Sequence, residues 1–518
     1  MHQLAEYPYM VQFRDIHNDF HLAEFNSLLL LFGVDPSTTY DVSKDHHGVF
    51  FLPVKFPSLD IARNICSRSI LIKCIVELWG VGADEDSLHD SVTNECPKGL
   101  KQRHIDSPWS LGIDAYGLKF KASETVEKRE RFLKKQTGLF EGKVSLSDPD
   151  ANVFVLIEDY GNTVLEAIKA ARKIKLGDDT EYVTIRESKR IRKAEKREKK
   201  KREHDTSEEF NKLSVVIKPT SQQKMDDQKE LVSNVRKSAA SNALQGVYFG
   251  RLVGKGRNDL VDKYSLKKRS FLGPTSMDNE LSFIMANQGL VRAGSLVLDP
   301  FVGTGSILIP PTILGAVCQG VEIDSRILER KEDKHLFDSF DQYDIPRPDI
   351  LRMDFSPLGR GMRNLSIYDA ILCDPPYGIR AGARKVGRSE RKKLKRPLQE
   401  NLPKPEKHCT PTQGYDTVDV VVDMLDAAAR LLKVNGRLVY LLPFVRAEYT
   451  IDSVPVHPCL VLVANSEQLI AFPFSRRLIT MEKTAVYDDE KAEEYTMFTR
   501  TKMSDAASAI SGIKSIMH

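Results

Sequence analysis

Runs of apolar residues interrupted by short polar turns dominate the second half of the chain. Leu296–Leu298 reads as the end of a buried strand, and a turn holding Gly303 and Gly305 follows it. The apolar pattern resumes at Ile307–Ile309, as expected at the start of a helix. Strand, glycine-bearing turn and helix in this order are typical of an open α/β sheet that binds nucleosides at the carboxyl ends of its strands. Glycines in such a turn let backbone N–H groups approach a ligand closely.

Three more apolar segments after this turn each end in an acidic residue. They are 317–324, ending in Glu322 and Asp324; 351–354, ending in Asp354; and 368–377, which runs into Asp374-Pro375-Pro376-Tyr377. Four strand ends in this order predict an α/β domain with a Rossmann-like, mostly parallel sheet and helices on both faces.

The first half of the chain has shorter and more mixed elements. Tyr9–Phe13 predicts a strand, Leu22–Leu31 an amphipathic helix and Val153–Glu158 a buried strand. From its pattern alone, this half is a pair of small α+β domains of unspecified function.

The net charge of +4 over 518 residues hides an uneven distribution. Residues 186–202 hold eleven Lys and Arg against three Glu, and residues 380–396 hold nine against one. The first run offers no apolar face to bury, so two interpretations stay open. It is an electrostatic arm for RNA, or a solvated insertion or nuclear-import-like tract.

Composition also excludes several classes of protein. The seven cysteines include no C-x-x-C pair, which argues against a disulfide framework and a zinc site and favours a reducing, cytosolic or nuclear compartment. The aliphatic run Leu28–Leu31 is far shorter than the roughly 20 residues of a membrane span. The start of the sequence lacks the basic and apolar regions of a signal peptide.

The tetrapeptide 374–377 carries the chemical argument. An exocyclic base amine is a poor nucleophile because its lone pair is delocalised into the ring. Two acceptors aimed at its hydrogens, the Asp374 carboxylate and the Pro375 carbonyl, would localise that lone pair. Pro375 and Pro376 stiffen the backbone, and Tyr377 would stack on the base. The alternative is that Pro-Pro only ends a strand before a surface loop.

With these motifs the sequence resembles class I methyltransferases that use S-adenosylmethionine (SAM) and act on exocyclic amines of nucleobases. Further segments resemble the catalytic subunit of the eukaryotic tRNA guanine-10 N2-methyltransferases. They are 75–80, 140–146, 264–269, 271–281, 454–459 and 475–483. The resemblance therefore covers most of the chain.

The resemblance implies a role for each candidate residue. The catalytic residues would be Asp374, Pro375, Pro376 and Tyr377. SAM would be held by Asp299, Phe301, Gly303, Gly305, Glu322, Asp324 and Asp354, with no metal in this chain. Glu322 would accept the ribose hydroxyls, with Asp324 as its rival, and Asp354 would face the adenine amine or else cap a helix.

The same resemblance implies a division of the chain. We expect a ferredoxin-like domain in 1–82, a THUMP-like RNA-binding domain in 83–180, a charged linker in 181–240, the methyltransferase domain in 241–490 and a flexible tail in 491–518. The expected partners are tRNA and a small zinc-binding activator subunit, with no membrane, in the cytoplasm. The competing functions are a DNA or rRNA amino-methyltransferase and a non-catalytic RNA-binding scaffold.

Overall fold

The computed structural model describes most of the chain in nine stretches. These are residues 6–148, 150–161, 244–273, 276–328, 335–356, 363–376, 383–387, 412–471 and 474–503. Tyr377, the basic run 186–202, most of the basic run 380–396 and the expected linker 181–240 lie outside the described residues. The chain forms two compact units. Unit 1 consists of Met1–Pro8 and Val76–Leu252, and unit 2 of Tyr9–Ile75 and Val253–His518.

Unit 1 is an α+β unit built on four neighbouring strands, the first of which is β3 (Ile72–Gly82) from Val76 onward. Strand β4 (Trp109–Tyr116) runs parallel to β5 (Asn152–Asp159), and β5 pairs antiparallel with β6 (Gly246–Lys255). Among its described residues the helices are α4 (Glu85–Asn94), α5 (Lys98–His104) and α6 (Ala122–Lys135). The core is aromatic, with the Trp79 and Phe154 rings 4.8 Å apart, and the segment Val153–Glu158 is a strand as predicted.

The amino-terminal part of unit 2 is a small α+β segment. Strands β1 (Tyr9–Phe13) and β2 (Phe51–Val54) pair antiparallel, and β3 (Ile72–Gly82) continues into unit 1. Helices α2 (His21–Leu31) and α3 (Leu59–Cys66) complete it, and α3 begins where the Ser58 hydroxyl accepts a hydrogen bond from Ile61 N. Residues expected in the first domain therefore lie in the same unit as the second half of the chain.

A seven-stranded sheet forms the centre of unit 2, in the order β14-β15-β13-β10-β7-β8-β9. Strands β13 (Leu432–Val445), β10 (Tyr368–Cys373), β7 (Leu296–Asp299), β8 (Val317–Glu322) and β9 (Asp349–Arg352) are parallel. Strands β15 (Phe474–Lys483) and β14 (Leu460–Ala471) return antiparallel. All four predicted strand ends therefore meet at one edge of the sheet.

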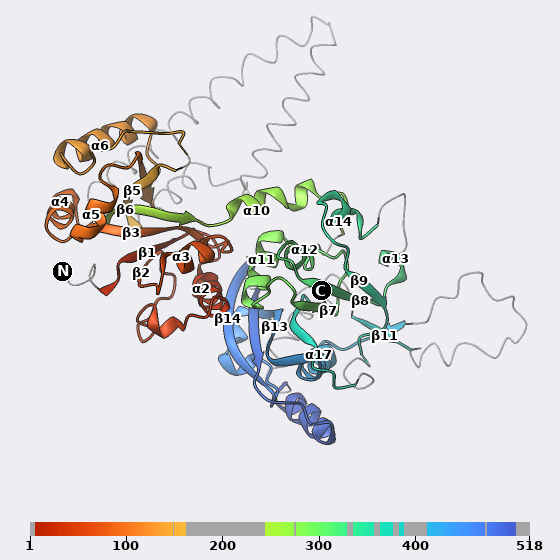
Figure 1. The fold of residues 1–518 in the computed structure, drawn as a ribbon. Coiled ribbons are helices and arrows are strands. Elements are labelled where there is room, and N and C mark those ends of the chain that lie inside the picture. Colours follow the sequence, from red (N-terminus) through yellow and green to blue (C-terminus); the bar gives the residue numbers. More distant parts are fainter. Residues whose placement is uncertain are drawn as a thin grey trace, which may run out of the picture. The chain divides into compact units, whose positions relative to one another are not determined.

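Helices cover both faces of this sheet (Figure 1). Leu298 and Ile371 pack in one core cluster with α17 (Thr417–Leu431). Val297 and Leu372, one position away on the same strands, pack with α11 (Asn279–Gln288) and α12 (Ile309–Ile313). The period of two along each strand produces this division. The predicted α/β, Rossmann-like fold with helices on both faces is confirmed.

The remaining elements of unit 2 are short. They are η1 (Asn18–Phe20), η2 (Pro36–Thr38), α10 (Asn258–Lys263), η4 (Leu266–Lys268), α13 (Ser325–Leu328), α14 (Asp338–Gln342), β11 (Arg384–Val386), β12 (Thr412–Gly414), η5 (Arg446–Glu448), η6 (Ile451–Ser453) and η7 (Asp489–Lys491). Residues 492–503, which the sequence analysis places in a flexible tail, are helical, and Thr499 and Met503 are buried.

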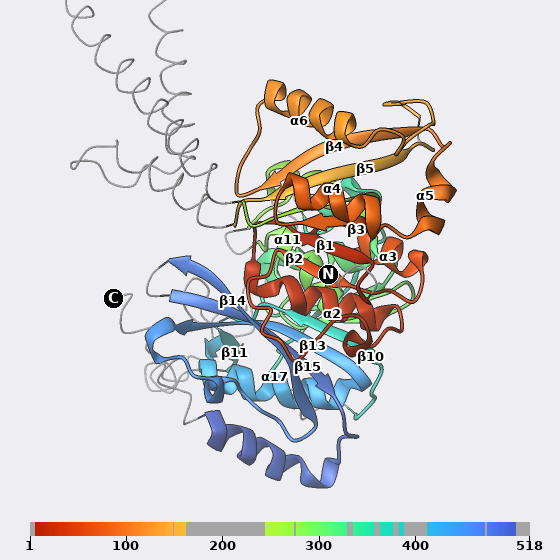
Figure 2. The same ribbon diagram turned by 90° about the vertical axis from the view of Figure 1, so that its left-hand side faces the viewer.

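A buried carboxylate joins the amino-terminal segment to α11. The Glu24 carboxylate on α2 accepts hydrogen bonds from Ser69 Oγ (2.6 Å), Ile70 N (3.0 Å), Leu71 N (3.0 Å) and Asn287 Nδ2 (2.8 Å). Helix α2 lies beside both α11 and β14, as Figures 1 and 2 show from two sides. Residues 9–75 therefore pack on the seven-stranded sheet and its helices.

Candidate active site

Strand β7 ends at a fully buried acidic residue. Asp299 Oδ1 accepts a hydrogen bond from Phe301 N at 2.9 Å, while Oδ2 is buried and has no hydrogen-bond partner in the part of the chain that the structure describes. Burial raises the pKa of this carboxyl group to about 8. A buried oxygen without a partner is costly, so a ligand donor at this position would be stabilising. This orphaned oxygen fits the amino-acid end of SAM.

The turn after β7 depends on two glycines with left-handed backbone angles. Gly303 has φ +49° and Gly305 has φ +75°. A Cβ on Gly305 would lie 3.0 Å from the Phe340 ring, whereas a Cβ on Gly303 would meet nothing closer than 3.8 Å. The turn is therefore packed against α14 at Gly305 and open at Gly303.

These two glycines should respond differently to substitution by alanine. We expect Gly305→Ala to lower the free energy of unfolding by about 2–3 kcal/mol, because backbone strain adds to the clash with Phe340. Gly303→Ala carries only the backbone strain, about 1 kcal/mol. Its added methyl group occupies the open side of the turn and should weaken SAM binding more than Gly305→Ala does. Chemical denaturation and calorimetric titration with SAM measure both effects. Equal losses of stability would contradict this difference.

The acidic residue at the end of β8 is hydrogen-bonded to the same turn. Glu322 Oε2 accepts from Gly303 N at 3.0 Å, and Oε1 accepts from Asp324 N at 2.8 Å. Burial raises the pKa of the Glu322 carboxyl group. Asp324 lies two residues further on, at the start of α13, and is partly exposed. The structure thus joins Glu322 directly to the glycine turn.

Asp354 and Phe301 are the remaining candidate cofactor residues, and Asp354 follows the end of β9. Asp354 Oδ1 accepts from Ser356 N at 2.9 Å and Oδ2 from Val386 N at 2.6 Å, so its carboxylate ties β11 to the end of β9. The rings of Phe301 and Phe355 lie 4.6 Å apart. The contact with Val386 was not anticipated, because nothing in the sequence pattern pairs the two segments.

Asp374 follows β10 directly, where the sequence places the catalytic motif. Its side chain is 30% exposed, and Arg476 Nη1 lies 4.0 Å from its Oδ2. Burial raises the pKa of Asp374 to about 6, and the charge of Arg476 opposes this rise. Pro375 is buried and Pro376 partly buried. The charges of Glu322 and Asp374 both raise the pKa of Asp299, so the acids from β8, β10 and β7 share one neighbourhood.

The sequence analysis did not identify two arginines that lie near these residues. Arg476 lies on β15, and Arg269 donates from Nη1 to Ser306 Oγ at 2.7 Å behind the glycine turn. Arg269 is buried, with its Nε and Nη2 unpartnered among the described residues. Both belong to segments quoted for the family resemblance, which was the only available signal.

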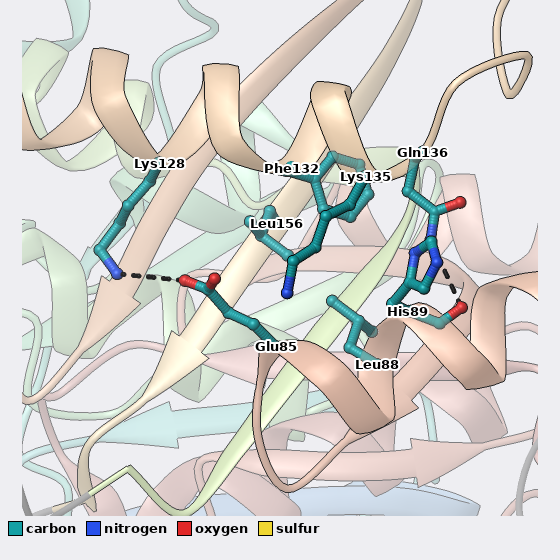
Figure 3. Close-up of a pocket in the computed structure, with 8 residues that line it drawn as sticks. All are labelled: Glu85, Leu88, His89, Lys128, Phe132, Lys135, Gln136 and Leu156. Atoms are coloured by element: carbon teal, nitrogen blue, oxygen red, sulfur yellow. Dashed lines mark hydrogen bonds and ion pairs between the residues drawn. The ribbon is translucent and has the colours of Figure 1, made fainter.

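Other features of the structure lie apart from these residues. A small pocket in unit 1 between α4 and α6 contains no predicted site residue (Figure 3). It is lined by Glu85, Leu88, His89, Lys128, Phe132, Lys135, Gln136 and Leu156. In the described part of the chain, no group of three His, Cys, Asp or Glu residues is arranged to hold a metal ion. None of the helices described there is long and apolar enough to cross a membrane.

The carboxyl edge of this Rossmann-like sheet brings together a glycine turn, an acidic residue on β8 and Asp-Pro-Pro after β10. This combination defines a SAM-dependent methyltransferase. Residues 7–184 match the family model of the Tmrp11 THUMP N-terminal domain. The tRNA (guanine(10)-N(2))-methyltransferase TRMT11 of Homo sapiens is 32% identical over 93% of this chain and 89% of that protein. Its counterpart from Dictyostelium discoideum is 30% identical over 93% of this chain and 83% of that protein. The chain therefore belongs to the tRNA (guanine(10)-N(2))-methyltransferase family.

Among solved structures, TrmN from Thermus thermophilus covers 92% of this chain and 99% of its own. Its sequence identity is 12% and its TM-score 0.37.

Proposed function

We propose that this chain is the catalytic subunit of an enzyme that transfers a methyl group from SAM to the exocyclic N2 of guanine 10 in tRNA. The observation that carries this proposal is the similarity to relatives with that activity in their names, which extends over more than nine-tenths of the chain. The placement of Asp374 beside the acids of β7 and β8 supports it.

In this reaction the residues of the chain would position the guanine and accept hydrogen bonds from its amino group. SAM supplies a methyl group already activated as a sulfonium. The Asp374 carboxylate and the Pro375 carbonyl would accept the two N2 hydrogens, and Tyr377 would stack on the base. A carboxyl group with a pKa of about 6 can also take up the proton that N2 releases. Because N2 of a paired guanine cannot reach the donor, the nucleotide must leave the stack at a cost of a few kcal/mol.

The cofactor residues keep the roles expected from the sequence. Asp299, Gly303 and Gly305 would hold the methionine side of SAM, and Phe301 would also contact the cofactor. Glu322 would accept the ribose hydroxyls and Asp354 would face the adenine amine. The hydrogen bond from Gly303 N to Glu322 supports Glu322 over Asp324, because it holds the carboxylate against the turn.

Two matched substitutions separate Glu322 from Asp324. Glu322→Gln should weaken SAM binding about tenfold, the effect of losing roughly 1.4 kcal/mol of charge-assisted hydrogen bonding. Asp324→Asn should leave the dissociation constant nearly unchanged. Calorimetric titration of both variants with SAM is the measurement. The reverse order would assign the ribose to Asp324.

The amino-terminal half would hold the tRNA at a distance from the reacting base. Its THUMP family match supports RNA binding, and RNA is usually recognised by shape and backbone over an extended surface. The division into 1–82, 83–180, 181–240, 241–490 and 491–518 stays part of this proposal, except that residues 492–503 of the last segment form a helix. So do a small zinc-binding activator subunit as partner, which the family resemblance implies, and a cytoplasmic location, which the cysteine usage favours.

Mapping of the methylated nucleoside tests the proposal. The full chain, with the activator, would be incubated with SAM and unmodified tRNA, and the nuclease digest analysed by mass spectrometry. The proposal predicts N2-methylguanosine at position 10 and no methylation of a guanine-10-to-adenine tRNA or of duplex DNA. Methylation of duplex DNA, of another tRNA position, or of nothing would overturn it.

A further inference from the structure

Arg476 is the only basic side chain that forms an ion pair with Asp374 among the described residues. It comes from β15, where it pairs in register with Pro443 of β13 and Gln468 of β14. Its Nε donates to Gln468 Oε1 at 2.6 Å, while Nη1 lies 4.0 Å from Asp374 Oδ2. The side chain of Gln468 therefore holds one end of the guanidinium and keeps the other near Asp374.

The spacing between the two charges matters for the reaction. At 4.0 Å, Arg476 attracts the carboxylate but forms no hydrogen bond with it. Both Asp374 oxygens therefore keep their lone pairs available for the hydrogens of an amine. A closer, bidentate arginine would occupy these acceptors.

The other titratable groups around Asp374 carry no positive charge. Asp299 on β7 interacts with it electrostatically, and so does Cys373 on β10. Glu322 on β8 acts on the same Asp299. On β13, Tyr440 pairs in register with Cys373, and its hydroxyl group is buried. Arg476 alone in this set is cationic.

We propose that Arg476 is a positioning residue that keeps the Asp374 carboxylate charged and free to accept the hydrogens of the substrate amine. This inference rests on the proposed function, since it concerns the same carboxylate. According to this inference, Arg476 on β15, which lies outside the four-residue motif, sets the pH range over which the enzyme is active.

The pH dependence of turnover is the first test. Activity needs the carboxylate, so kcat falls as the pH drops through the pKa of Asp374. Arg476 lowers that pKa, so its loss raises it. In Arg476→Gln the acid limb of kcat should move to higher pH by about 1 unit, with kcat recovered at high pH. Arg476→Lys should restore most of the shift. Thermal unfolding of both variants confirms that they fold.

Arg446→Gln is the matched control. Arg446 is 54% exposed and pairs with Glu467 at 3.1 Å, on neighbouring elements but with no contact to Asp374. The inference predicts an unmoved acid limb in this variant. If Arg446→Gln moved the acid limb of kcat as far as Arg476→Gln does, the shift would come from the general loss of a positive charge and not from the contact of Arg476 with Asp374. That result would overturn the inference. A uniform loss at every pH with a raised KM for tRNA in Arg476→Gln would also overturn it, because it would make Arg476 an RNA contact.

A second measurement does not depend on turnover. Protein labelled with 13C at aspartate Cγ gives a resonance for the Asp374 carboxyl group. This resonance is assigned by its absence in Asp374→Asn, and its chemical shift follows the titration of the carboxyl group directly. The titration midpoint should rise in Arg476→Gln and stay in place in Arg446→Gln. An unchanged midpoint in Arg476→Gln sinks the inference even if the wild-type protein methylates tRNA. Conversely, wild-type protein that titrates as expected but does not methylate tRNA would leave the inference standing and remove the proposed function.

Discussion

Replacing Asp374 with alanine is expected to lower kcat for methyl transfer to tRNA by about 10²–10³-fold, while SAM binding stays largely intact. In the proposed mechanism the carboxylate would accept hydrogen bonds from the reacting amine, and it has no hydrogen bond to the glycine turn among those the structure describes. Its loss therefore removes stabilisation of the reacting base without disturbing the cofactor turn. Single-turnover transfer of a tritiated methyl group measures the rate, and calorimetry measures SAM affinity.

The control for this variant is another carboxylate of similar exposure. Asp419 on α17 is 28% exposed, against 30% for Asp374, and pairs with Arg500 at 2.6 Å. Asp419→Ala should keep the wild-type rate. If Asp374→Ala retained wild-type turnover, the catalytic assignment would be wrong, however well the cofactor residues performed.

Replacing Glu24 with alanine is expected to destabilise unit 2 by about 3–5 kcal/mol. Glu24 is fully buried and its carboxylate accepts four hydrogen bonds, two of them from the backbone at Ile70 and Leu71. The variant leaves these buried donors without partners and opens a cavity between α2 and α11. Chemical denaturation followed by the fluorescence or circular dichroism of the full chain measures the loss.

Asp60→Ala provides the comparison, because this carboxylate on α3 is 81% exposed and pairs with Arg63 at 3.2 Å. Its effect should stay within about 0.5 kcal/mol, as for other surface positions. A Glu24→Ala protein as stable as wild type would mean that residues 9–75 contribute little to the stability of the methyltransferase sheet.

The sequence predicted the parts of the site that depend on local pattern. Three parts of the site can each be predicted from consecutive residues. They are the strand Leu296–Asp299, the turn with Gly303 and Gly305, and the strand that leads into Asp374. Parallel strands bring their carboxyl ends to one edge of a sheet, so the proximity of Asp299, Glu322 and Asp374 followed from topology alone.

Contacts made by side chains across the fold could not be predicted in this way. Arg476 reaches Asp374 only because β15 returns antiparallel next to β13, at a register that no local pattern specifies. The contact of Asp354 with Val386 N depends on a hairpin of two three-residue strands, each too short to show a periodicity. Likewise, Glu24 and Asn287 are separated by more than half the chain, and their hydrogen bond appears only in the folded protein.

A crystal structure of the protein with a non-reactive SAM analogue and a guanosine-containing RNA fragment tests the central claim most directly. The account predicts the Asp374 carboxylate and the Pro375 carbonyl within hydrogen-bonding distance of the guanine N2, on the side facing the sulfonium position. An Asp374 side chain turned away from the base, or a base bound with N2 directed elsewhere, would contradict it.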